Sequence, residues 1–181
     1  MLPSPTFPLS IITTTHNMAT STGLSGHRSA QLLSMTSCAL FFGSTTWASV
    51  AVKPSLIAAP ISTYAKLAVF KGLILRANAI LPPVFGITLS SLAYLALYSP
   101  LPKSRRNYLV AVGALLTSFG LQIPVLPRNK AMVKVVDDGR GQNDDGREGN
   151  ERIRELLMLN WGRVVLGGVA FGIGLLEIAS S

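Results

Sequence analysis

The chain has 181 residues, of which 49% are apolar and only 13% are charged, and its formal net charge is +8. Soluble domains usually contain about 25% charged residues, so this composition favours a single membrane domain over a soluble one. The Lys and Arg residues stand singly between apolar runs and form no basic patch with interleaved aromatic residues, so we expect no nucleic-acid partner.

Cysteine and histidine are both scarce. Cys38 is the only cysteine, and the two histidines, His16 and His27, lie in the N-terminal tail. One cysteine allows neither an intrachain disulfide nor a cysteine-based zinc site. A metal or haem inside a membrane bundle would also lack its commonest ligands, so we expect no metal and no bound cofactor.

The N-terminal part of the chain is polar and then becomes apolar. Residues 1–30 are rich in Ser, Thr and Pro and contain no acidic residue, which predicts a disordered tail rather than a signal peptide. Residues 31–52 form the first predicted span, which is uncharged but carries many hydroxyl groups. Such a helix either lines a polar cavity or, more commonly, packs closely through its small residues. Gly43 and Trp47, four residues apart on one face, are the pair that we expect to border a pocket.

Three further spans follow. Residues 55–76 are apolar but contain three cations, so we predict a segment at the membrane interface. In the second span Pro82-Pro83 is placed to kink or start the helix, and in the third Gln122 is the one strongly polar residue near the exit. Residues 127–155 are rich in Gly, Asp and Asn and predict a mobile, solvated loop without the spacing of a calcium site. The four predicted spans cover residues 31–52, 78–98, 108–126 and 156–177.

These elements predict an all-α membrane protein: a bundle of four transmembrane helices over residues 31–181, behind a disordered tail. The connections 53–76 and 127–155 hold eleven Lys and Arg residues, whereas the tail and the turn 99–107 hold four. The positive-inside rule therefore places the two longer connections in the cytosol and both termini in the lumen.

The last span contains the most informative residues of the chain. Residues 156–176 read LLMLNWGRVVLGGVAFGIGLL, and Arg163 is their only charge. An arginine within a span usually faces the bundle interior and has a function, although it can also extend to the lipid headgroups. Asn160 lies one turn earlier on the same face, where it serves the site or bridges two helices. Small residues continue that face at Gly167, Ala170 and Gly174, which predicts close approach of a neighbouring helix.

The order of three short motifs resembles a known family. The first span contains Gly43 and Trp47, the third leaves through Pro127-x-Asn129, and the last opens with Leu159-Asn160-x-x-Arg163. Over residues 31–176 this order is similar to the four-helix anthrone oxygenase-like membrane proteins of fungal polyketide pathways. The resemblance implies oxidation of an anthrone to an anthraquinone by O₂, without metal or flavin, in secondary-metabolite biosynthesis. It also implies a location in the endoplasmic reticulum or a related endomembrane, where membrane lipid and soluble pathway enzymes are the partners.

The chemistry of such a reaction assigns expected roles to particular residues. An anthrone has an acidic methylene, and its enolate reacts with O₂ directly, so the protein must supply an apolar slot, a proton acceptor and groups that stabilise the developing negative oxygen. Arg163 suits the last role, with Asn160 as a second donor. The proton acceptor is Asn129, Gln122, a water or the substrate's own phenolate. Aromatic surfaces for the substrate are expected from Trp47 and Trp161, although Trp161 is more often an interfacial residue.

Two other classes of function are consistent with the sequence. A non-catalytic membrane scaffold or accessory protein could hold soluble pathway enzymes at the membrane, and Asn160 and Arg163 would then be replaceable. A small transporter is less favoured, because the chain has no detectable repeat and no chain of acidic residues within its spans.

Overall fold

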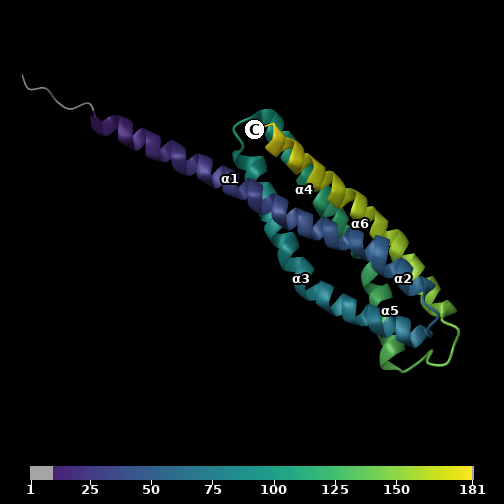
Figure 1. Cartoon of the computed structure of the whole chain (residues 1–181). Coiled ribbons are helices and arrows are strands. Elements are labelled where there is room, and N and C mark those ends of the chain that lie inside the picture. The colour runs from purple at the N-terminus through teal and green to yellow at the C-terminus, as the bar shows by residue number, and fades with distance from the viewer. Residues whose placement is uncertain (1–9, 181) are drawn as a thin grey trace, which may run out of the picture.

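The computed structural model describes residues 10–180, and side chains are described from Gly26 onward. Every regular element of the described chain is a helix (Figure 1). The elements are α1 (Ser10–Trp47), the π-helical turn η1 (Ala48–Val52), α2 (Lys53–Ala58), α3 (Thr63–Tyr98), α4 (Pro102–Gly120), α5 (Val125–Asp137) and α6 (Arg147–Ala179).

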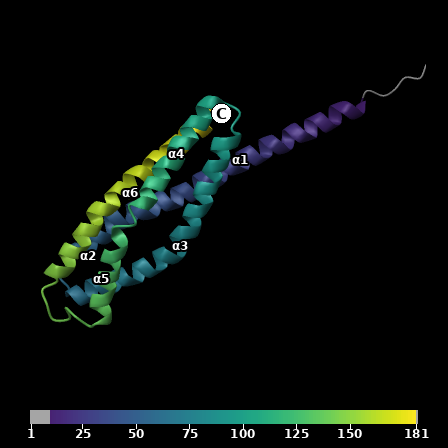
Figure 2. The same ribbon diagram turned by 180° about the vertical axis from the view of Figure 1, so that it is seen from behind.

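Four helical stretches are long and apolar enough to cross a membrane, which confirms the predicted all-α, multi-pass membrane architecture. They cover Gly26–Ala58, Thr63–Tyr98, Pro102–Asp137 and Arg147–Ala179. The first nine residues of the predicted tail lie outside the described residues. From Ser10 the backbone is helical and continues into the first span, and this part of α1 projects from the bundle in Figures 1 and 2.

The second span is longer than predicted, because residues 63–76 belong to α3 and are not a separate interfacial segment. Two of their three cations have partners from distant parts of the chain. Lys66 is 2% exposed and donates to Asn150 Oδ1 at 2.6 Å, and Lys71 pairs with Asp137 at 2.5 Å. With both ammonium groups held by these partners, one helix continues through the whole stretch.

The connection between α5 and α6 is also shorter than predicted. Helix α5 extends to Asp137 and α6 begins at Arg147, so the 127–155 loop is reduced to residues 138–146, and Asn129 is helical. This loop is tied to the start of α3. Asp144 Oδ1 accepts from the Thr63 backbone N–H at 2.7 Å, which satisfies a donor that the helix itself cannot.

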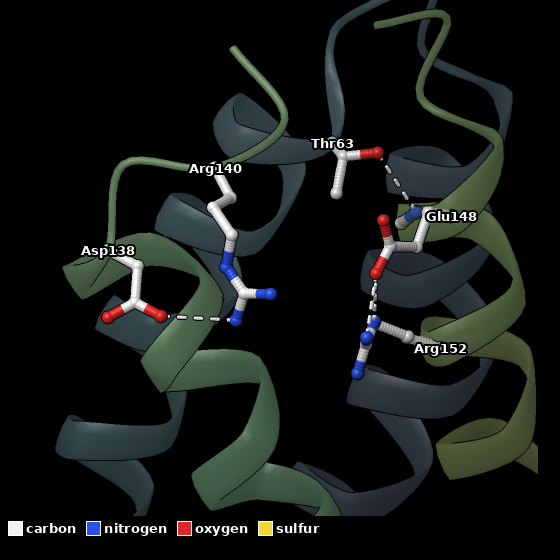
Figure 3. Close-up of polar contacts among 6 residues, drawn as sticks. Thr63, Asp138, Arg140, Glu148 and Arg152 are labelled. Atoms are coloured by element: carbon white, nitrogen blue, oxygen red, sulfur yellow. Dashed lines mark hydrogen bonds and ion pairs between the residues drawn. The ribbon is translucent and has the colours of Figure 1, made fainter.

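Several local contacts hold this end of the bundle together (Figure 3). The Thr63 hydroxyl accepts from the backbone N–H of Gly149 in the first turn of α6, at 3.1 Å. The Thr63 hydroxyl and backbone N–H together lower the pKa of Asp144 below its usual value, because both stabilise the carboxylate. Exposed ion pairs, Arg140 with Asp138 and Arg152 with Glu148, flank these contacts.

Helix α3 bends in its middle in both views of the ribbon, where Pro82 and Pro83 lie (Figures 1 and 2). Of the two predicted roles for these prolines, the structure therefore supports the kink. Proline has no N–H, so neither residue can donate to the carbonyl one turn earlier, at Asn78 or Ala79. The bend separates two packed regions of the bundle.

Two hydrophobic cores stabilise the fold. The first joins α1, α3, α4 and α6 around the fully buried Leu92, Leu95, Ala111 and Leu115. The second joins α3, α5 and α6 and consists of Leu67, Phe70, Val125, Met132, Val135, Ile153 and Leu156.

The predicted small-residue face of α6 is buried at Gly167, Ala170 and Gly174. A Cβ atom on Gly167 would lie 3.7 Å from the Phe42 ring, and one on Gly174 would meet Met35. These residues therefore bring α6 close to α1, as their spacing predicted.

Candidate functional site

A cavity of about 580 Å³ lies between the two cores, beside the bend of α3. Its walls come from α1, η1, α2, α3, α5 and α6, together with the end of α4 and the turn after it. The volume falls in the range of about 300–1,000 Å³ that is typical of small-molecule sites. Trp47 and Ile80 line the cavity and are 65% and 60% exposed, so it opens at the outer surface of the bundle.

Most of the cavity wall is apolar and aromatic. Phe41, Phe85 and Phe119 form a connected series, with ring centroids 5.9 Å apart for Phe41 and Phe85 and 4.8 Å apart for Phe85 and Phe119. Phe70 extends the aromatic wall on the side of the second core. Such a surface suits a flat aromatic ligand, which can stack on the rings or meet their edges.

Positive charge is concentrated in this apolar cavity. Lys53, Arg76 and Arg163 line it, and its lining contains no Asp or Glu. Lys53 is 6% exposed, and its ammonium lies 3.5 Å from the carbonyl oxygen of Leu156. The Arg163 guanidinium carbon lies 5.8 Å from the centroid of the Phe41 ring, a cation–π contact. The cavity is therefore electrostatically suited to an anion.

Arg163 and Gln122 each present an unsatisfied polar atom. Four buried side-chain polar atoms in the described part of the chain have no hydrogen-bond partner, and two of these, Arg163 Nε and Gln122 Oε1, belong to residues that line the cavity. Buried polar groups are normally hydrogen-bonded. A ligand that offers one acceptor and one donor would satisfy both atoms.

Asn160 joins α6 to the end of the first span. Its side chain is 7% exposed, and Nδ2 donates to the Ser49 hydroxyl at 2.5 Å and to the Thr45 carbonyl at 3.1 Å. Both amide hydrogens are thereby engaged, so they are not available to a ligand. The bridge meets the first span where α1 changes into the π-helical turn, a distortion that is common at functional sites. The bridging interpretation of Asn160 therefore fits better than that of a second oxyanion donor.

Of the six residues predicted for the site, five line this one cavity: Trp47, Gln122, Asn129, Asn160 and Arg163. Trp161 does not line it and is 44% exposed, because one residue after Asn160 the helix has turned by about 100°. Gly43, the predicted companion of Trp47, is exposed and also lies outside the cavity lining.

Sequence reasoning missed Lys53 and the aromatic wall. Lys53 flanks the predicted first span, where lysine is expected for topological reasons. Its spacing of four and eight residues from Ser49 and Thr45 was the available signal, because this spacing extends one polar face beyond the predicted end of the span.

The described residues contain no group of three His, Cys, Asp or Glu side chains that could hold a metal ion. No protein family matches this chain, and neither does any curated protein or any solved structure. The geometry and charge of the cavity are therefore the basis for assigning a function.

Proposed function

We propose that the protein is a cofactor-independent oxygenase that converts an anthrone-type polyketide intermediate to an anthraquinone. The observation that carries this proposal is the pairing of an aromatic cavity of about 580 Å³ with the buried Lys53, the half-buried Arg163 and no lining carboxylate. A tricyclic anthrone would occupy the aromatic part of the cavity. The anthrone oxygen, which would become negative during the reaction, would face Arg163.

The proposed reaction needs only the substrate and O₂. The anthrone methylene loses one proton and becomes an enolate, whose carbon forms a bond with O₂. Protonation gives a hydroperoxide, which loses the second hydrogen of that carbon as its O–O bond breaks, leaving a carbonyl group and one molecule of water. The first deprotonation is the step that a cation can assist, because the charge spreads onto the anthrone oxygen.

The lining residues offer no strong proton acceptor. Asn129 and Gln122 line the cavity, but neutral amides are weak bases. A phenolate on the substrate itself is the acceptor that a cationic cavity favours, because nearby positive charge stabilises it.

As part of the same proposal, the protein resides in the endoplasmic reticulum or a related endomembrane and receives its substrate from soluble enzymes of the pathway. The exposed rim at Trp47 supports access from the bilayer, where an uncharged polycyclic substrate would accumulate. A scaffold without activity would have no need for a half-buried arginine within a span whose buried Nε has no hydrogen-bond partner, because such a charge is costly in a membrane.

The test is quinone formation by microsomes that contain the protein and are given an emodin-type anthrone, with spontaneous oxidation in empty microsomes subtracted. We expect Arg163→Ala to lower the catalysed rate by about 100-fold, the usual effect of removing one oxyanion donor. Arg106→Ala is the matched control, because Arg106 is exposed and does not line the cavity. A wild-type rate equal to that of empty microsomes, with this and related anthrones, would refute the oxygenase assignment.

A further inference from the structure

We infer that Lys53 and Arg163 together form a two-cation site that binds a hydroxylated planar aromatic compound as its anion and promotes its ionisation. This inference deepens the proposed function and rests on it for the choice of aromatic ligand. It assigns a ligand-binding role to Lys53, which the predicted site did not include.

The first argument is the absence of nearby negative charge. Some other cations at the same end of the bundle are paired with carboxylates, such as Lys71 with Asp137 and Arg128 with Glu155. Lys53 instead has a single long contact with a backbone carbonyl, although it is 6% exposed. Burying a cation without a partner is costly, and an anionic ligand would offset that cost.

The second argument is that the charged groups of Lys53 and Arg163 face the same part of the cavity. Lys53 reaches the carbonyl of Leu156, two turns before Arg163 on α6, and side chains of a helix lean toward its N-terminus. Both side chains line the same cavity, so their two positive charges repel each other across it. An anion bound between them would remove this repulsion and be attracted by both, so the ionised form of a phenol is favoured over the neutral form.

The third argument identifies the class of anion. Gln122 Oε1 is buried in the cavity wall and needs a donor, whereas Arg163 Nε needs an acceptor. A fatty-acid carboxylate would satisfy the cation but has no hydrogen to donate. An aromatic compound with one ionised and one neutral hydroxyl would satisfy both atoms and also fill the wall formed by Phe41, Phe85 and Phe119.

The test uses an emodin-type hydroxyanthraquinone, which is already oxidised and therefore reports binding without turnover. The probe is titrated with the purified full-length protein in non-ionic detergent, at a pH about one unit below the pKa of the free probe, with protein-free micelles as the blank. We expect the bound probe to show the red-shifted absorbance of its phenolate, with its pKa lowered by about one unit or more, a tenfold change in ionisation. An analogue with all hydroxyls methylated should show no such band.

Substitutions locate the effect. Lys53→Met and Arg163→Met should each reduce the phenolate band, the double variant should abolish it, and Lys53→Arg should retain it because the charge remains. Lys103→Met is the control at an exposed lysine outside the cavity. Gln122→Leu should weaken probe binding about fivefold, the effect of one lost hydrogen bond. Helical circular dichroism confirms that each variant is folded.

Two results would overturn the inference: a neutral spectrum for the probe bound to the wild-type protein, or an unchanged phenolate band in a folded double variant. Displacement of the probe by oleate at equal concentration, together with unchanged binding in Gln122→Leu, would overturn the aromatic class. A phenolate band without quinone formation would support the anion site and contradict the oxygenase. Quinone formation together with a neutral bound probe would support the oxygenase and contradict the anion site.

Discussion

Asn160 shows how one side chain can hold a membrane cavity in shape. Its two hydrogen bonds, to Ser49 and to the Thr45 carbonyl, connect α6 to the first span beside Lys53 and Arg163, the two cations of the cavity. Because these bonds consume both amide hydrogens, Asn160 acts by positioning the helices that carry the two cations. We therefore propose that Asn160 contributes to function through structure and Arg163 through charge.

We predict that Asn160→Ala and Ser49→Ala each destabilise the protein in detergent, and that the two effects are not additive. The hydrogen bond that joins them should give a coupling free energy of about 1 kcal/mol in a double-mutant cycle of thermal unfolding, since intramembrane hydrogen bonds average about 0.6 and reach about 1.7 kcal/mol. Thr36→Ala, at an exposed hydroxyl of α1, is the matched control. Strict additivity of Asn160→Ala and Ser49→Ala would show that this hydrogen bond does not stabilise the bundle.

Asp144 is the second residue with a testable structural role, at the end of the bundle where α3 and α6 begin. Since the pKa of its carboxyl group is lowered by the Thr63 hydroxyl and backbone N–H, the unfolded chain binds the proton more tightly than the folded chain. The resulting stability is present above the unfolded pKa, near about 3.9 for Asp, and is lost as the pH falls through the lower folded value.

We therefore predict that Asp144→Asn reduces the loss of stability on acidification below about pH 4. The measurement is the thermal midpoint of the wild type and the variant between neutral pH and pH 3. Asp145→Asn, a change at the neighbouring exposed carboxylate, is the control. Parallel curves for wild type and Asp144→Asn would show that the hydrogen bonds from Thr63 to Asp144 do not stabilise the fold.

At the scale of elements, the bend of α3 is the feature that makes room for a ligand. Pro82 lines the cavity, and the bend separates the core around Leu95 from the core around Leu67. A straight helix would bring the middle of α3 closer to α1 and α5. The two prolines therefore remove two backbone hydrogen bonds, and the bend that they cause leaves room for the cavity.

We predict that replacing Pro82 and Pro83 by alanine restores those hydrogen bonds, raises the free energy of unfolding by about 1 kcal/mol or more, and weakens binding of the hydroxyanthraquinone probe. Pro54→Ala is the matched control, because Pro54 lies in α2, outside the bend of α3, and does not line the cavity. Thermal unfolding and probe titration measure the two effects. A variant that is more stable and binds the probe as well as the wild type would show that ligand binding does not depend on the bend.

At the scale of the whole molecule, the two ends of the bundle differ in their number of Lys and Arg residues and in their connections. The α2–α3 and α5–α6 connections meet at one end, and the α3–α4 turn and the C-terminus lie at the other (Figure 1). From the positive-inside rule we expect the first end to be cytosolic.

This orientation predicts that Asn143→Cys, in a Cys38→Ser background, reacts with a membrane-impermeant maleimide in sealed microsomes whose cytosolic face is outward. Asn143 is exposed in the α5–α6 loop, and Cys38 is buried, so the background change removes only the native thiol. Lys103→Cys, at an exposed position in the first turn of α4, should react only after the membrane is permeabilised. The opposite labelling pattern would invert the topology.

Much of the architecture was predictable from the sequence. Four apolar stretches indicated the four spans, and the small residues around Gly167 indicated the packing face of α6. The bounds of the second span were missed because the partners of Lys66 and Lys71 lie far along the chain, at Asn150 and Asp137. Because the sequence alone does not show these partners, an apolar segment with several cations predicts an interfacial position.

The candidate site was predictable where a polar residue interrupts an apolar helix. Arg163 and Asn160 are such residues, and both line the cavity. Lys53 was not recognised because a lysine at the end of a span already has a topological explanation. The expectation for Trp161 rested on chemistry alone, whereas its side-chain position depends on the rotation of α6, which packing against the neighbouring helices determines.

The most direct test of the central claim is the oxygen balance of the purified protein. With an emodin-type anthrone, in the presence of a metal chelator and without added flavin, we predict uptake of one O₂ per quinone formed, no accumulation of hydrogen peroxide, and a rate well above the spontaneous one. Arg163→Ala should return the rate nearly to the spontaneous value. A wild-type rate that does not exceed spontaneous oxidation, or that disappears with the chelator, would contradict a cofactor-independent oxygenase.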